Sequence, residues 1–221
     1  MGLLWTQAMP WWNNERKYDY EGDDEYPLRD PSESLKDRGK RYQQQVVDAH
    51  GVTPQVAQKA IQRVVRGLSN NGEVWGDPKE YGFASSSRAP LSHLVHPDKA
   101  PKIYRADTWA HLPVQPVSLR DEPIHASQDF IRHRGVAHNL FHPGKIAPHD
   151  EEQGDPDYDP AWDHDDSTWE SDDDTEHLKY PRFLRRNNGE LMAMDGHHRI
   201  ATDFLLGKSH TMARVLHEKD L

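Results

Sequence analysis

Apolar residues recur with helical spacing in two neighbouring segments near the start of the chain. Residues 32–50 carry a sparse apolar stripe and stop at Gly51, a residue typical of helix ends. Thr53 then provides a helix-capping residue, and Pro54 is the residue favoured at the first helical position. The apolar spacing resumes directly afterwards. The pattern therefore predicts a helical hairpin over residues 32–68.

This predicted hairpin allows two interpretations. The second helix has a polar face of amide and basic side chains, namely Gln55, Gln58, Lys59, Gln62, Arg63 and Arg66. Such a face is found on the helix that a helix-turn-helix protein inserts into the DNA major groove. It is also ordinary for the outer side of a helix whose apolar side packs on a domain. We favour the second interpretation, because it explains the pattern without DNA.

From Tyr180 to Leu216 short apolar runs alternate with turn residues. The predicted order is strand, hairpin turn, strand, glycine turn, helix and strand, at residues 183–186, 187–189, 191–194, 195–196, 198–206 and 211–216. Glycines stand where the hairpin turn and the helix end need a positive φ. This segment therefore predicts a small unit in which strands and a helix pack together.

The pattern between these two regions is weaker. Residues 69–101 are rich in turn residues and predict a linker. Residues 114–119 predict a strand, and residues 130–141 predict a short helix. We therefore expect an α+β fold, with a mixed-sheet domain over residues 102–221.

The composition predicts that extended arms accompany the compact part of the chain. Apolar residues make up 34% of the 221 residues, and the mean hydropathy is -1.00. We therefore expect a compact part of roughly 110 to 130 residues. Residues 1–31 have no helical or strand period but contain many aromatic side chains, which are costly to expose to water. Three alternatives are open for this arm. It folds back on its own domain, it docks on a protein partner or a second copy of the chain, or it stays disordered.

The acidic residues are concentrated in one place. Residues 150–176 hold 14 of the 37 acidic residues and no lysine or arginine, which is typical of a solvated insertion. The rest of the chain has 27 basic residues against 23 acidic ones. The net charge of -10 therefore does not exclude a site for nucleic acid on the body of the protein.

Several classes of protein are excluded by what the sequence lacks. The chain has no cysteine, which rules out disulfides, thiolate catalysis and cysteine-bound zinc. No stretch approaches the roughly 20 apolar residues that cross a bilayer. Residues 1–10 also lack the basic start and long apolar run of a signal peptide. We therefore expect a cytoplasmic protein without a membrane partner.

The turn Asp195-Gly196-His197-His198-Arg199 has the clearest chemistry. A glycine turn that leads into a helix exposes backbone N–H groups and the positive end of the helix dipole, which favour an anion. Arg199 can add a two-pronged contact to a phosphate, and the histidines offer further donors. The same residues can also serve only to cap the helix. A metal site here is the weakest option, because adjacent histidines point to different faces.

The run Met194–Ala201, followed by Leu205–Lys208 and Ala213–Leu216, resembles the DGHHR-type motif of the ParB/sulfiredoxin-like superfamily. The resemblance implies a small ParB-like fold in which Gly196 and Arg199 bind a nucleotide phosphate. It also implies that His198 contacts the phosphate and that Asp195 and His197 belong to the same site, with His197 as a catalytic candidate.

Upstream, residues 111–119 resemble the first strand of that superfamily, although more loosely. The resemblance implies a catalytic acidic or polar position just after this strand. Asp121 and Glu122 are the candidates for a general base or magnesium ligand, and His125 and Gln128 are further candidates. The sequence departs from the CTP-dependent partition clamps, whose motif is closer to Gly-Glu-Arg-Arg, and from sulfiredoxins, which need a cysteine.

Members of this superfamily include CTP-binding partition proteins, ATP-using sulfiredoxins, free-serine kinases and nucleases. The resemblance therefore implies binding of a nucleotide or nucleic acid, with a nuclease or phosphotransferase as the possible enzyme. It implies a nucleoside triphosphate with Mg²⁺ as cofactor. The alternative is a structural or docking component of a larger assembly. ParB-like domains are frequent in phage genomes, so a bacteriophage particle is one such assembly, and the protein would then be located in the virion.

Overall fold

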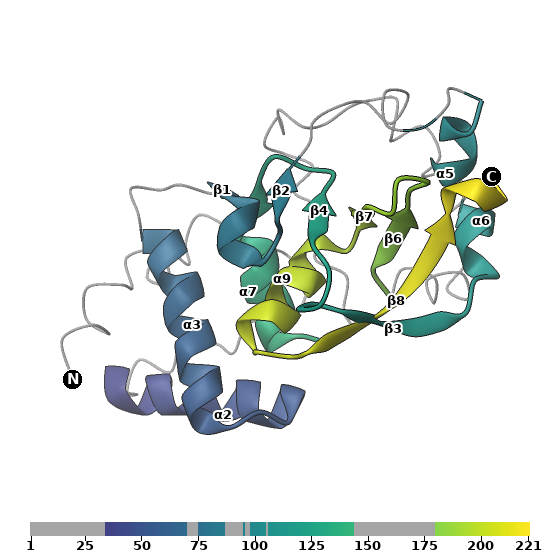
Figure 1. The fold of residues 1–221 in the computed structure, drawn as a ribbon. Coiled ribbons are helices and arrows are strands. Elements are labelled where there is room, and N and C mark those ends of the chain that lie inside the picture. Colours follow the sequence, from purple (N-terminus) through teal and green to yellow (C-terminus); the bar gives the residue numbers. More distant parts are fainter. Residues whose placement is uncertain (1–33, 70–74, 87–94, 96–97, 105, 144–179) are drawn as a thin grey trace, which may run out of the picture.

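The computed structural model describes residues 34–69, 75–86, 95, 98–104, 106–143 and 180–221 (Figure 1). Its helices and mixed sheet form an α+β fold, as predicted. The aromatic arm over residues 1–31 and the acidic insertion over residues 150–176 lie outside the described residues. Within the described part of the chain, no helix has the length and apolar character needed to cross a bilayer.

The predicted helical hairpin is present as α2 (Leu35–His50) and α3 (Pro54–Ser69). The Ser34 side chain caps α2, and Gly51 ends it at φ 64. Apolar residues of α3 belong to the same core as residues of the sheet. The apolar side of α3 therefore packs on the domain, and the hairpin is part of one folded unit.

Six strands form the main sheet. Their order across it is β2 (Ser85–Ser86), β4 (Ile124–Ala126), β7 (Leu191–Asp195), β6 (Arg182–Arg185), β8 (His210–His217) and β3 (Val114–Ser118). β2, β4 and β7 run parallel to one another, whereas β6 is antiparallel to β7 and parallel to β8. β3 closes the far edge antiparallel to β8. The strands predicted over 114–119, 183–186, 191–194 and 211–216 are thus confirmed to within one or two residues.

The expectation of a linker over residues 69–101 is corrected by the structure. This segment contains β1 (Trp75–Gly76), the short 3-10 helix η2 (Pro78–Tyr81) and the edge strand β2. Tyr81 and Phe83 are buried in the core. Strands of two residues are too short to show an alternating pattern, so their pairing depends on contacts with distant parts of the chain.

The helix predicted over residues 130–141 is shorter than expected. Its first part forms β5 (Ile131–Arg132), which pairs with β1, and α7 (His133–Phe141) follows. The predicted C-terminal helix is α9 (His197–Leu205). Both helices lie on the same side of the sheet as α2 and α3 (Figure 1).

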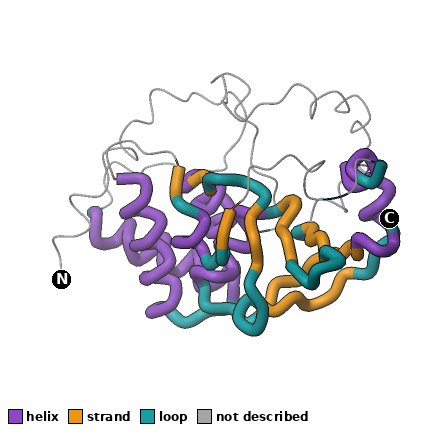
Figure 2. Tube along the Cα trace, turned by 45° about the horizontal axis from the view of Figure 1, so that its top comes forward, coloured by secondary structure: helices purple, strands orange, loops and turns teal. Residues whose placement is uncertain are grey.

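The sheet separates two apolar cores. The larger core lies between one face of the sheet and α2, α3, α7 and α9. The smaller core contains Leu184, Leu216 and the fully buried Trp109, which belongs to α6 (Ala106–Ala110). α5 (Ala100–Tyr104) precedes α6 beside it. Figure 2 shows most helices gathered on one side of the strands, with a smaller helical group near the C-terminus. The predicted turn lies where β7 ends and α9 begins.

Candidate phosphate site

Gly196 connects β7 to α9 in a conformation that favours glycine. Its φ is 76°, and it occupies the N-cap position of α9. A Cβ atom added there would lie 2.8 Å from Cα of Pro181, so a larger residue would collide with backbone. The N–H groups of Arg199 and Ile200 donate to the Gly196 carbonyl at 2.9 and 3.0 Å. The turn predicted from the sequence therefore does lead directly into a helix N-terminus.

Among the described residues, the charged side chains near this turn include Asp195, Arg182, Arg199 and Arg214. Pairing of the strands places Arg182 beside Asp195 on one neighbour and beside Arg214 on the other. Nε of Arg182 is 3.8 Å from Oδ2 of Asp195. The Asp195 side chain also accepts from the N–H of Gly196 at 2.5 Å. Arg199 follows from the first turn of α9.

The Arg182 side chain is only 10% exposed. Its guanidinium lies 5.8 Å from the centre of the Trp109 ring. Nε and Nη2 are both buried and have no hydrogen-bond partner within the described part of the chain. Arg214 differs, because its Nη1 donates to backbone carbonyls, including that of Trp109 at 2.8 Å. Arg182 is therefore a buried cation with two nitrogens that have no hydrogen bond to a described residue.

Burial and neighbouring charges shift the pKa values of two arginines at the turn. Burial lowers the pKa of Arg182, as do nearby Arg214 and Arg199, and Asp195 opposes this by raising it. Burial also lowers the pKa of Arg199, again opposed by Asp195. Arginine stays protonated in proteins despite such effects. Among the described residues, the Asp195 carboxylate thus acts on the guanidinium groups of both Arg182 and Arg199.

The two histidines of the turn pack into the fold. His197 is 3% exposed, and its Nε2 accepts from the backbone N–H of Ser127 at 3.3 Å. The His198 ring lies against Gly135 of α7, where an added Cβ would be 2.6 Å from ring atoms. Burial is the largest cause that lowers the pKa of His197 to about 4 and that of His198 to about 3. Both rings are therefore neutral near pH 7.

This packing changes the roles expected of the histidines. The buried His197 ring joins the turn to the end of β4, and His198 joins it to α7. Neither ring offers a positive charge to a phosphate, and their different partners do not converge on a metal ion. Among the described residues, no group of three metal-binding side chains is present. The two histidines therefore have packing roles in the fold.

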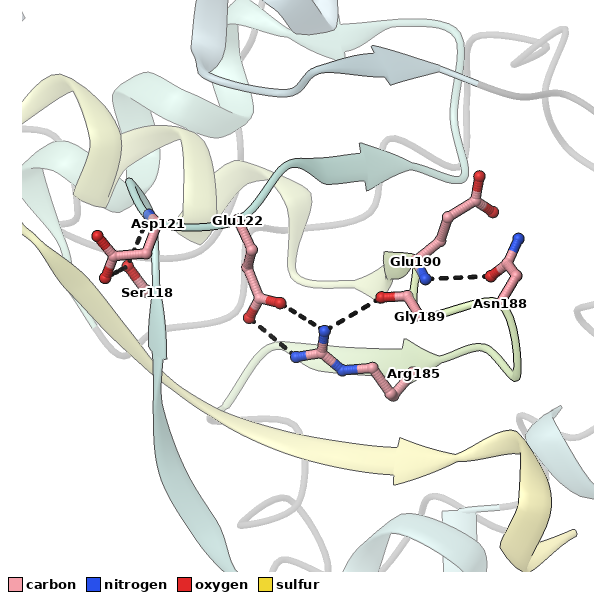
Figure 3. A network of polar contacts seen from close by, with 7 residues as sticks. All are labelled: Ser118, Asp121, Glu122, Arg185, Asn188, Gly189 and Glu190. Carbon is pink, nitrogen blue, oxygen red and sulfur yellow. Dashed lines mark hydrogen bonds and ion pairs between the residues drawn. The ribbon is translucent and has the colours of Figure 1, made fainter.

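Glu122 and Asp121 do not reach the turn, contrary to the expectation from the resemblance. Glu122 forms a two-pronged ion pair with Arg185, with one contact of 2.9 Å (Figure 3). This hydrogen bonding is the main cause that lowers the pKa of Glu122. The Asp121 carboxylate accepts from the Ser118 hydroxyl at 2.7 Å. Both carboxylates are engaged in structural contacts.

Strand register explains the separation. Ile124 of β4 pairs with Leu191, the first residue of β7, so Glu122 lies level with the hairpin turn before β7. Gly196 lies past the opposite end of β7. At ~3.3 Å per residue, the two positions are about 20 Å apart along the sheet. Of the other upstream candidates, His125 bonds to Ser85 at 2.7 Å, whereas Gln128 follows the end of β4 that adjoins the turn.

A pocket of about 310 Å³ adjoins the turn. Its lining includes Arg199 together with Tyr180 and Pro181, and Pro181 is the residue that Gly196 contacts. Asn139 of α7 and Lys208 also line it. The volume falls within the range of small-molecule sites. Arg199 therefore lines a space large enough for a small molecule.

A larger pocket of about 730 Å³ lies elsewhere, beside α3 and the start of α7. His133 lines it and is hydrogen-bonded to the Tyr81 hydroxyl. Burial raises the pKa of Tyr81 to about 12. Arg63 also lines this pocket, but it is paired with Glu80 at 3.1 Å. None of the residues predicted for the phosphate site lines this second pocket.

No family profile matches the chain, and comparisons with curated proteins and with solved structures likewise find no match. The resemblance to the ParB/sulfiredoxin-like superfamily therefore rests on the motif itself. Arg182, Arg214 and Asn139 were not identified from the sequence. The strand pairing of Arg182 and Arg214 joins residues far apart in the chain, and no local pattern marks Asn139 as a pocket residue.

Proposed function

We propose that the Gly196–Arg199 turn binds the phosphate of a nucleotide or a nucleic acid. The observation that carries this proposal is the buried guanidinium of Arg182, whose Nε and Nη2 have no hydrogen-bond partner within the described residues. A buried donor without a partner costs roughly 1 to 3 kcal/mol, and more when it is charged. A bound anion would offset that cost.

Three further features favour phosphate as the anion. The N-terminus of α9 presents backbone N–H groups and the positive end of its dipole, and glycine allows a close approach. Arg199 adds a second guanidinium that lines the adjoining pocket. Arginine forks match the geometry of phosphate oxygens. Among the described residues whose charges act on Arg182, Asp195 is acidic and Arg199 and Arg214 are basic.

The proposal concerns binding and contains no chemical step. The carboxylates expected to act as a base lie about 20 Å away along the sheet at ~3.3 Å per residue, and Glu122 is held by Arg185. No group of three metal ligands occurs among the described residues. A nucleoside triphosphate would bring its own magnesium ion bound to its phosphates, as such sites commonly use few protein ligands.

Calorimetric titration of the full chain tests this proposal. ATP, CTP and a short single-stranded oligonucleotide would be added in the presence of Mg²⁺. We expect Arg199→Ala to weaken binding by about one to two decades, because a hydrogen bond to a charged group contributes roughly 1.5 to 3 kcal/mol. Arg199→Lys should recover only part of the loss, since an ammonium keeps the charge but not the fork.

Arg63→Ala provides the matched control. It also removes one arginine, but from α3 and from the other pocket. Binding should change little in this variant. If the unmodified protein binds none of the three ligands at millimolar concentration, the phosphate site is refuted, and a docking component of an assembly becomes the better hypothesis. Equal losses in the Arg63 and Arg199 variants would indicate general charge attraction instead of a site.

A further inference from the structure

The larger pocket, of about 730 Å³, is built by segments that lie far apart in the chain. The C-terminal half of α3 borders it together with β1, η2 and the start of α7, and we call it the α3 pocket. Its volume falls within the range of small-molecule sites. It shares no lining residue with the pocket beside the Gly196 turn. The α3 pocket is therefore a candidate site for a separate ligand.

The buried part of its lining is tightly packed. Tyr81 and His133 are buried and hydrogen-bonded to each other. A Cβ atom added to Gly67 of α3 or to Gly76 of β1 would lie 2.6 Å from Cε1 of the His133 ring. The ring therefore fills the space that these two glycines leave for it. Such packing forms the pocket in advance, so that a ligand binds at a small cost in ordering.

Some charged side chains of the lining are already engaged. Nη2 of Arg63 lies 3.1 Å from Oε2 of Glu80. Oδ1 of Asp77 accepts from the backbone N–H of Lys79 at 2.9 Å. The side chains of Arg66 and Lys79 differ, because neither has an ion pair or hydrogen bond to another described residue. Both residues are exposed, so their cationic groups are available to a ligand.

An aromatic ring also lines the α3 pocket. Phe130 is 41% exposed, which is unusual for so large an apolar side chain. A flat apolar group that packs on this ring would remove its surface from water, and aromatic pairs gain further from offset or edge-to-face contact. The lining thus combines cations with an apolar surface.

We infer that the α3 pocket binds a small aromatic carboxylic acid. The carboxylate of this ligand binds Arg66 and Lys79, and its ring packs against Phe130. An arginine fork matches the two oxygens of a carboxylate, and a lysine adds a second positive charge. This inference does not depend on the phosphate site, because the two pockets have separate linings.

The lining favours a carboxylate over a phosphate. Asp77, Glu80 and Asp129 also line the α3 pocket. Their negative charges repel a dianionic phosphate about twice as strongly as a monoanionic carboxylate. The N–H of Lys79 at the start of η2 is bound by Asp77 and is not offered to a phosphate.

Ligands of matched shape test this inference with the full chain. Phenylacetate, phenylacetamide and phenethylamine carry the same ring and differ in charge. Ligand-observed NMR titration measures the Kd of each. We expect phenylacetate to bind about tenfold or more tightly than the amide, because it adds contacts between charged groups. The amine should bind most weakly.

Variants locate the site. Arg66→Gln and Lys79→Gln should each weaken phenylacetate binding about three- to tenfold and leave the amide nearly unchanged. Phe130→Ala should weaken both ligands alike. Lys59→Gln is the matched control, since Lys59 is an exposed cation of the same helix that does not line the pocket. Arg199→Ala should likewise leave phenylacetate binding unchanged.

Four results would overturn the inference. Equal affinities for the acid and the amide would exclude the carboxylate contact. Equal losses in Lys59→Gln and Arg66→Gln would indicate general charge attraction. Tighter binding of phenyl phosphate than of phenylacetate would assign the pocket to a phosphate, and absence of phenylacetate binding at millimolar concentration would refute the site. The comparison of acid and amide uses the unmodified protein, so it decides even where a variant fails to fold.

Discussion

Acidification should destabilise this fold through the histidines of the turn. Burial lowers the pKa of His197 to about 4, whereas the ordinary value is 6.5. The unfolded chain therefore takes up a proton on this side chain at a pH where the folded protein does not. Proton uptake by the unfolded state favours unfolding, so stability is lost as the pH falls from about 6.5 toward 4. His198, with a pKa of about 3, acts in the same direction.

The size of this effect can be worked out for His197. At pH 5 the unfolded side chain lies about 1.5 pH units below its own pKa and is almost fully protonated. The folded side chain is still mostly neutral. Each unit corresponds to about 1.4 kcal/mol, so His197 alone should lower the free energy of unfolding by about 2 kcal/mol between pH 7.5 and pH 5.

Urea unfolding at pH 7.5 and pH 5 measures this loss. The informative variant is His197→Gln, whose side-chain oxygen can accept from Ser127 as the imidazole nitrogen does but does not titrate. This variant should lose about 2 kcal/mol less than the unmodified protein between the two pH values. The exposed His210 supplies the control, and His210→Gln should leave the difference unchanged.

Identical pH dependence of the unmodified protein and His197→Gln would refute the reasoning. It would mean that the imidazole can be protonated in the folded state. The turn would then be more open than its contacts with Ser127 and Phe83 indicate. A smaller loss in His210→Gln would instead assign the effect to exposed histidines.

Arg182→Met should keep or raise the melting temperature and weaken phosphate binding by about tenfold or more, since removing an unsatisfied buried cation relieves its desolvation; loss of both stability and binding would indicate a structural arginine. Gly196→Ala should lower the free energy of unfolding by roughly 1 to 3 kcal/mol in urea melts, because of the positive φ and the contact with Pro181; an unchanged midpoint would contradict the tight turn. Glu122→Gln should cost roughly 1 kcal/mol of stability through its pair with Arg185 and leave nucleotide affinity unchanged by calorimetry, whereas a large loss of affinity would place Glu122 in the site. Replacing residues 150–176 by a Gly/Ser linker, which removes 14 acidic residues, should raise affinity for an oligonucleotide at low salt and less so at high salt; no gain at low salt would show that this segment does not screen the site.

Elements held together by contacts close in the chain were predictable from the sequence. The hairpin of β6 and β7, the Gly196 turn, α9 and β8 follow one another directly, and glycines mark their turns. α2 and α3 were predictable for the same reason, because the Ser34 cap, Gly51 and Pro54 mark their ends. In each case the residues that decide the conformation lie within a few positions of the ends of that helix or strand.

The composition of the site depended on tertiary structure. Arg182 and Arg214 meet because β6 and β8 lie side by side, and Asn139 reaches the pocket because α7 packs against α9. The register of β4 with β7 likewise separates Glu122 from the turn, although the resemblance implied that they act together. Strand order and register are set by burial across the whole sheet and not by neighbours in sequence. A local motif could therefore locate the turn, whereas only the folded chain decided which side chains surround it.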